Sequence, residues 1–261
     1  MLKEGNVCFN SEYSSPLSTV VPYYSADVQQ YTGDLDQLLD ELEGSLKALA
    51  PSEQDKLNFA LHPPRIIWGA VNYKISQGND TGQSERIVRE AIRISLRTYR
   101  KEVMPSDVRS FREFIVRSGH AQALQTPVAQ VADTVTWEAT SPERAKKTAD
   151  RLRDQCGYNQ ILFIAQGQGG AAAGMDVYLR YQDLTFNPNS RFYVSRLSLY
   201  KVKDEIPQLN AREIATLQKQ AQGRSIVIFD EDTSSGNTMR TAVNYFSEVF
   251  KGRELITATN L

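Results

Sequence analysis

The sequence predicts an α/β fold: a doubly wound parallel sheet in residues 141–261, preceded by a mostly helical region of unknown role in residues 1–140. The first supporting observation is that short apolar runs alternate with amphipathic segments from residue 141 onward. This pattern is typical of parallel sheets with right-handed helical crossovers. The second is that one apolar run, residues 226–229, leads into three consecutive acids and a small polar loop. Ligands of open α/β sheets bind at such carboxyl ends of strands.

Composition excludes several classes of protein. Hydrophobic residues make up 41% of the 261 residues and charged residues 23%, as in ordinary globular proteins. The net charge of −1 gives no global attraction to nucleic acid or membrane. The two cysteines, Cys8 and Cys156, form neither a disulfide framework nor a metal-ligand spacing. No secretory leader or membrane span is expected, so a reducing cytoplasmic setting is the default.

Two long segments of the N-terminal region predict helices, at residues 34–50 and 84–104. The first places leucines on one stripe: Leu35, Leu38, Leu39, Leu42, Leu46 and Leu49. Between the two segments, His62-Pro63-Pro64 is expected to end any helix, because proline lacks an N–H donor and clashes with the preceding turn. The apolar segment 66–75 then fits either a strand or a buried helix.

The helix expected at 84–104 carries a stripe of arginines spaced three and four apart, namely Arg86, Arg89, Arg93, Arg97 and Arg100. One interpretation is a surface that faces phosphate groups or nucleic acid. The other is a solvated face that is partly neutralised by Glu85, Glu90 and Glu102. The second interpretation is favoured, because runs of charge on a helix usually face water.

In residues 141–261 the expected helices and strands alternate. Ser141 and Pro142 predict a helix start, with serine as the N-cap and proline in the first turn. That helix should run to about Cys156. Strands are expected at residues 161–165, 191–199, 226–229 and 254–258. Further helices are expected up to about residue 181, at 210–221 and at 238–250.

The most informative stretch runs from residue 225 to residue 238. Asp230, Glu231 and Asp232 place carboxylates at the carboxyl end of the buried strand. The loop that follows leads into an amphipathic helix. N–H groups of such a loop and of a helix N-terminus bind anions, and hydroxyl groups add uncharged donors. The acids should face sugar hydroxyls or a metal, because a phosphate would repel them.

This stretch resembles the motif that binds phosphoribosyl pyrophosphate (PRPP) in type I phosphoribosyltransferases. Asp230 and Glu231 match the two adjacent acids that hold the ribose 2′- and 3′-hydroxyls in that family. The matching 5′-phosphate loop consists of Thr233, Ser234, Ser235, Gly236, Asn237 and Thr238. The resemblance covers the C-terminal half alone. It implies a type I phosphoribosyltransferase fold there, with Mg²⁺ carried on PRPP near the two acids rather than bound directly.

Two further segments take roles from the resemblance. The family's pyrophosphate loop corresponds to Gln166, Gly167, Gln168 and Gly169, whose small residues would let backbone approach a ligand closely. That loop often carries a basic residue, whereas the two glutamines here offer only amides. A mobile basic loop that closes over PRPP corresponds to Lys201 and Lys203, with Arg196 as a weaker candidate. These residues would neutralise pyrophosphate.

The resemblance implies an enzyme of nucleotide metabolism, a glycosyltransferase that transfers phosphoribosyl from Mg–PRPP to an unidentified nitrogen acceptor and releases pyrophosphate. Purine-type members carry base-recognition residues after the last core strands, where this sequence offers little chain. A hood over the acceptor is therefore expected from the N-terminal half or from a second copy in a homodimer.

Two alternatives stay open. One is a non-catalytic regulator that binds ribose phosphate or a nucleotide, with the arginine stripe engaging nucleic acid or a partner. The other starts from residues 230–234, which approach the nucleophile loop of haloacid-dehalogenase-type phosphatases. There the first Asp attacks a phosphoryl group and the second acts as acid and base. That family places a lysine and further acids much later in the chain, and here little chain follows the loop.

Overall fold

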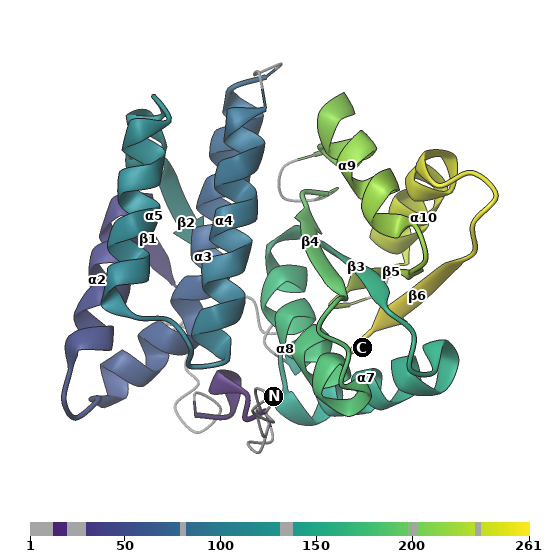
Figure 1. Cartoon of the computed structure of the whole chain (residues 1–261), viewed down its shortest axis with the longest axis horizontal. Helices are drawn as coiled ribbons and strands as arrows, with labels where there is room; N and C mark the ends of the chain where they lie inside the picture. Colours follow the sequence, from purple (N-terminus) through teal and green to yellow (C-terminus); the bar gives the residue numbers. More distant parts are fainter. Residues whose placement is uncertain are drawn as a thin grey trace, which may run out of the picture.

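The computed structural model describes residues 13–19, 30–78, 82–130, 138–197, 199, 203–232 and 236–261, without the side chains of Thr19 and Gln168. Of the candidate site residues, Lys201, Thr233, Ser234 and Ser235 lie outside these ranges. A helical part from the N-terminal residues lies beside an α/β part from the C-terminal residues (Figure 1). The predicted α/β class is confirmed, with a small antiparallel sheet added.

The N-terminal part packs α-helices around a two-stranded antiparallel sheet. Its elements are η1 (Pro16–Thr19), β1 (Tyr31–Asp34), α2 (Leu35–Lys47), α3 (Glu53–Ser76), α4 (Gln83–Tyr99), α5 (Pro105–Arg117), η3 (Ala121–Gln125) and β2 (Pro127–Gln130). α2 begins as predicted, because the Asp34 side chain accepts from the N–H of Gln37 and the Gln37 side chain accepts from the N–H of Asp34. Leu49 follows the end of this helix and is fully exposed.

The prediction that His62-Pro63-Pro64 ends a helix is wrong, because α3 continues through both prolines. Pro64 cannot donate to the carbonyl of Ala60, which would otherwise be left without its helical partner. The hydroxyl of Tyr99 on α4 donates to that carbonyl at 2.8 Å. Segment 66–75 is therefore a buried helix rather than a strand. Tyr99 of the neighbouring helix α4 replaces the hydrogen bond that is lost at Pro64.

The C-terminal part alternates helices and strands as predicted. Its elements are α7 (Pro142–Cys156), β3 (Ile161–Gln166), α8 (Gly167–Thr185), β4 (Arg191–Ser195), α9 (Ala211–Ala221), β5 (Ser225–Asp230), α10 (Asn237–Val249) and β6 (Leu255–Thr259). The strands are parallel, in the order β4-β3-β5-β6. The order reverses at β3, which lies between β4 and β5. Such a switch point is where ligands of open α/β sheets bind.

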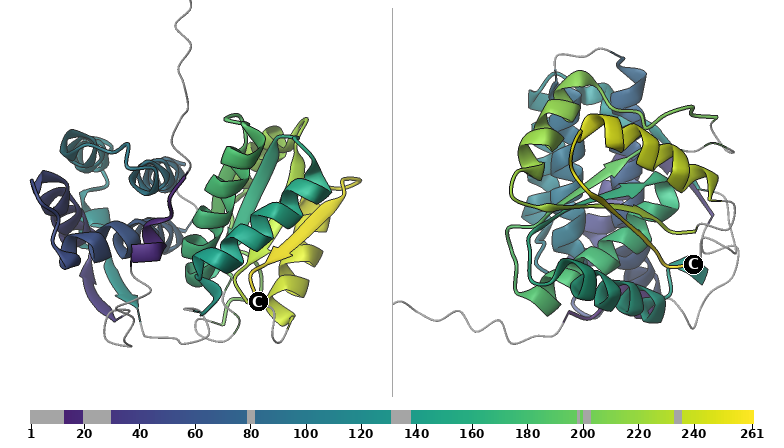
Figure 2. Two further views of the ribbon diagram at one scale, coloured as in Figure 1. Left: turned by 90° about the horizontal axis from the view of Figure 1, so that it is seen from below. Right: turned by 90° about the vertical axis from the view of Figure 1, so that its right-hand side faces the viewer.

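The register aligns the strands, so the sheet has two chemically distinct edges. At the carboxyl edge, where the strands end, Gln166 lies beside Ser195, and Asp230 beside Thr259. At the amino edge, where they begin, Ile161 lies beside Ser225. Helices cover both faces, with α9 and α10 on one side and α7 and α8 on the other (Figures 1 and 2). Within the described ranges, no helix combines the length and apolar composition needed to cross a bilayer.

A buried ion pair joins the two parts near the carboxyl edge. Lys74 of α3 contacts both carboxylate oxygens of Glu213 on α9, at 2.9 and 3.0 Å, and donates to the carbonyl of Gln208 at 2.8 Å. Tyr193 of β4 donates its hydroxyl to the same carboxylate. Burial, and then the charge of Glu213, raise the pKa of Tyr193. The N-terminal helices are thus fixed against the sheet at the edge that carries the candidate site. The expected boundary near residue 140 stays a prediction.

Candidate functional site at the carboxyl edge

The acid pair lies where the sequence predicts it, at the end of β5 and at the switch point of the sheet. Asp230 is the last residue of the strand and is only 6% exposed, whereas Glu231 is half-buried. Burial raises the pKa of Asp230 to about 9, and the neighbouring charge and hydrogen bond of Glu231 add to this effect. The two carboxyl groups therefore hold a proton between them at neutral pH. Such a pair both donates and accepts hydrogen bonds.

The first turn of α8 lies directly beside this acid pair. A Cβ added to Gly170 would stand 3.3 Å from an Oε atom of Glu231, so glycine lets the helix and the carboxylate approach closely. The N–H groups of a first helical turn have no partner within the helix, and they carry the positive end of its dipole. An anionic carboxylate is stabilised there. The sequence analysis named residues 166–169 as candidates for this position, but not Gly170.

The prediction of a loop at residues 166–169 is wrong, because β3 ends at Gln166 and α8 begins at Gly167 without an intervening loop. Gln166 is the last strand residue and is fully buried. Its side chain accepts from the Ser195 hydroxyl at 2.7 Å and donates to the Ile164 carbonyl. A polar side chain at this strand end is satisfied by its neighbour in register, so Gln166 does not face a ligand. Gly167, at φ 68°, makes the sharp turn from strand to helix.

The described end of the expected 5′-phosphate loop forms the start of α10. Gly236 is the N-cap residue in a left-handed conformation, with φ 65°. Asn237 is exposed and Thr238 half-buried in the first turn. The structure thus brings a second helix N-terminus to the carboxyl edge, next to Asp230 and Glu231 in the chain. The hydroxyl residues at 233–235 lie outside the described residues.

The basic candidates are placed differently from one another. Arg196, just after β4, forms a bidentate ion pair with Asp204, at 2.9 and 3.1 Å, and contacts the side-chain oxygen of Asn72 on α3 at 3.4 Å. Lys203 is exposed in a left-handed conformation, with φ 57°. Sequence reasoning missed both partners: Asp204 lies across an irregular loop from Arg196, and Asn72 lies on a distant helix that no local pattern connects to it. Lys201 is outside the described residues.

The arginine stripe of α4 is largely occupied within the chain. Arg93 pairs with Glu90 at 2.7 Å, and Arg97 pairs with Asp107 at 2.8 Å. Arg89 pairs with Glu85, whereas Arg86 contacts Gln83 and Arg100 contacts Gln182. These contacts favour the interpretation of a neutralised face over one that binds nucleic acid.

In the described part of the chain, no group of three His, Cys, Asp or Glu side chains could hold a metal ion. The Mg²⁺ expected on PRPP stays a prediction. No family model matches the chain, and no curated protein or solved structure matches it significantly.

Proposed function

We propose that this protein binds Mg–PRPP at the carboxyl edge and transfers phosphoribosyl to a nitrogen acceptor, releasing pyrophosphate. The observation that carries the proposal is the position of Asp230 and Glu231. Asp230 ends β5 at the switch point of a parallel sheet, and Glu231 follows it beside the first turn of α8, a few residues before α10 begins. PRPP has a ribose with a pyrophosphate at one end and a phosphate at the other. Acids for the ribose and two helix N-termini for the phosphate groups match this arrangement.

Each part of PRPP has a partner of suitable chemistry. Asp230 and Glu231 would hold the ribose 2′- and 3′-hydroxyls, since their shared proton lets the pair donate and accept. The start of α10 and the loop before it would bind the 5′-phosphate through N–H groups and hydroxyls. The first turn of α8, with Gly167 and Gly169, would receive the pyrophosphate. Lys201 and Lys203 would add positive charge, and Mg²⁺ would arrive on the substrate.

The chemistry asked of the protein is positioning and charge stabilisation. Phosphoribosyl transfer passes through an oxocarbenium-like state, in which the bond from ribose C1 to pyrophosphate breaks as the nitrogen approaches from the opposite face. Acids at the ribose hydroxyls orient the sugar, and helix N-termini stabilise the departing negative charge. Asn72 of α3 contacts Arg196, so α3 lies at this edge of the sheet. This position supports the proposal that the N-terminal part forms a wall of the acceptor pocket.

A non-catalytic binder of ribose phosphate is the second candidate. The burial of Gln166 favours it, because the turn from β3 into α8 then offers backbone donors but no polar side chain from that residue. A haloacid-dehalogenase-type phosphatase is less well supported. Its first Asp must be an ionised nucleophile, whereas burial, and then the charge of Glu231, raise the pKa of Asp230.

Calorimetric titration separates these functions. Mg–PRPP, ribose 5-phosphate and a nucleoside monophosphate are titrated into the wild type and into Asp230→Asn/Glu231→Gln. We expect micromolar PRPP binding by the wild type and a loss of at least about tenfold in the variant, since two hydrogen-bonding charges are removed. The matched control Asp154→Asn/Glu113→Gln, on exposed helix surfaces, should bind like the wild type. Monophosphate binding without PRPP binding would favour the regulator, and binding of none would reject the site.

A further inference from the structure

The amino edge of the sheet carries a surface that the proposed transferase site does not use. Four turns meet there, each just before a strand: residues 157–160, 186–190, 222–224 and 250–254. The Asn187 side chain donates to the Tyr158 carbonyl at 3.0 Å. Arg224 donates to the Asn189 carbonyl at 3.1 Å, and Arg253 to the Arg224 carbonyl at 2.6 Å. The turns therefore form one continuous patch, which we call the amino-edge surface.

This surface carries an excess of positive charge. Among the described residues, Arg191, Arg224 and Arg253 form no ion pair with a carboxylate, and Glu254 is the acid beside them. Burial, and then the neighbouring charge of Arg191, lower the pKa of Arg224. Arg224 and Arg253 also donate to carbonyls at the end of α9. A helix end offers only about half a negative charge, so the guanidinium charges are not cancelled.

Two aromatic side chains stand out from the same surface. Tyr158 is 71% exposed and Phe186 is 80% exposed. Phe186 also ends α8 in the left-handed conformation, at φ 51° and ψ 36°, where glycine or asparagine is the usual residue. A large aromatic group that is both strained and exposed contributes nothing to the core. Strain of this kind is concentrated at functional sites.

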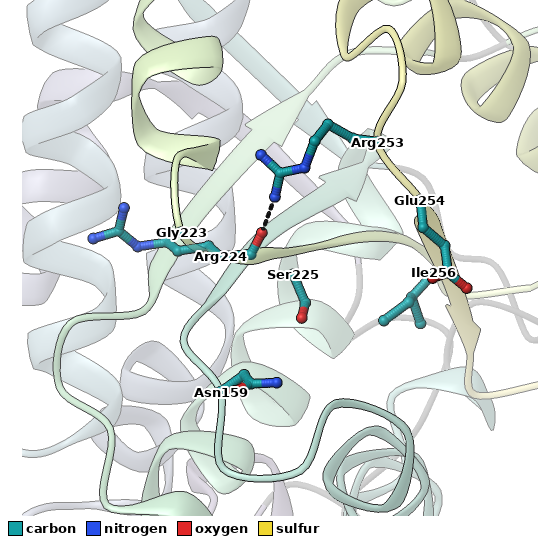
Figure 3. Close-up of a pocket in the computed structure, with 7 residues that line it drawn as sticks. All are labelled: Asn159, Gly223, Arg224, Ser225, Arg253, Glu254 and Ile256. Carbon is teal, nitrogen blue, oxygen red and sulfur yellow. Dashed lines mark hydrogen bonds between the residues drawn. The ribbon is translucent and has the colours of Figure 1, made fainter.

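A cavity of about 320 Å³ opens between the turns and adds polar groups to the surface (Figure 3). Its lining includes the amide of Asn159 and the hydroxyl of Ser225, beside Ile256. Figure 3 shows the side chain of Arg253 reaching toward the start of β5, whereas that of Arg224 points away from Glu254. Amide and hydroxyl groups of this kind hydrogen-bond to the edges of nucleic-acid bases.

We infer that the amino-edge surface binds single-stranded nucleic acid. Unpaired bases stack on Tyr158 and Phe186, and the backbone phosphates lie against Arg191, Arg224 and Arg253. Duplexes are excluded, because their bases are already stacked and do not reach exposed rings. This binding is separate from the carboxyl edge and does not depend on PRPP.

Fluorescence anisotropy with a labelled single strand of about 12 nucleotides, as RNA and as DNA, tests the inference. Over about 50 to 200 mM salt, three phosphate contacts predict a slope of log affinity against log salt of about −2. Phe186→Gly and Tyr158→Ser should each weaken binding about tenfold. Arg191→Gln, which removes a side chain with a single local hydrogen bond, should make the slope shallower by about 0.7.

The controls separate binding from folding and from the other proposal. Phe186→Gly relieves a strained conformation, so its thermal stability should equal or exceed that of the wild type while binding falls. Leu49→Ser and Arg93→Gln, an exposed leucine and a paired arginine elsewhere, should bind normally. Asp230→Asn/Glu231→Gln should also bind normally. No binding by the wild type at low salt, equal binding of a duplex, or aromatic variants that match the controls would each overturn the inference.

Discussion

The two edges of the parallel sheet differ in almost every chemical respect. The carboxyl edge holds the acid pair and the N-termini of α8 and α10, and one of its arginines, Arg196, is paired with Asp204. The amino edge holds helix C-termini, exposed aromatic rings and arginines that have no carboxylate partner within the described ranges. A parallel sheet with helical crossovers orients every connecting helix the same way, so dipoles add at each edge. Two ligand chemistries therefore fit one sheet.

The largest expected effect concerns the buried brace at the carboxyl edge. Lys74→Met leaves the carboxylate of Glu213 buried without its cation, and should lower the free energy of unfolding by about 3–5 kcal/mol, measured by urea denaturation. The double variant Lys74→Met/Glu213→Gln should recover much of this loss, because it removes the stranded charge. A double variant as unstable as the single one would contradict this explanation.

The next effect concerns the approach of α8 to the strands. A Cβ on Gly174 would stand 3.0 Å from the Cβ of Ala165 and 3.2 Å from the ring of Phe229. Gly174→Val should therefore cost about 2–3 kcal/mol of stability by overpacking, and should shift the Asp230 site with it. The same change at Gly44, where nothing lies within 4 Å, is the matched control and should cost little.

A smaller effect should reveal that the acid pair is destabilising for the fold. The raised pKa of Asp230 means that the folded state favours the protonated form. The protonated form of Asp230 therefore contributes stability that is fully present below the unfolded pKa of about 4 and is lost as pH rises toward about 9. At higher pH the buried, ionised carboxylate lowers the stability of the folded state. Asp230→Asn should thus stabilise the protein by about 1–2 kcal/mol at pH near 8, with little gain at pH near 4. A gain that is independent of pH would contradict the assignment.

The smallest effect lies at the amino edge. Phe186→Gly should raise the free energy of unfolding by about 0.5–1 kcal/mol, because glycine adopts the left-handed conformation without strain. Phe186→Ala keeps the strain and removes only the ring, so calorimetric melting should show no comparable gain. If glycine and alanine had equal effects, the backbone strain would not be the cause.

Local patterns alone predicted the four parallel strands, the starts of α2, α7 and α9, and the position of Asp230 and Glu231, but neither β1 nor β2 nor the start of α8 at Gly167. Those features depend on periodicity, capping and one ordered motif, all of which are local. The course of α3 could not be predicted that way. A helix through Pro63 and Pro64 requires the hydroxyl of Tyr99, which only the tertiary packing brings to the Ala60 carbonyl.

The same limit explains what was missed at the two edges. Gln166 looked like a loop residue, and its burial follows from pairing with Ser195 across the sheet. The regular spacing of the α4 arginines suggests a binding face, but three of the five pair with carboxylates of the same chain and the other two contact glutamines. The arginines without an acidic partner in the described part of the chain lie at the starts of different strands, and only the register of the strands brings them together.

Amide hydrogen exchange of the whole protein with and without Mg–PRPP tests the central claim most directly. The account predicts protection of the end of β5, the start of α10 and the first turn of α8, with no change in the turns at residues 157–160 and 222–224. Protection should disappear in Asp230→Asn/Glu231→Gln. Protection confined to the amino edge, or none anywhere at saturating Mg–PRPP, would contradict the assignment of the carboxyl edge as the phosphoribosyl site.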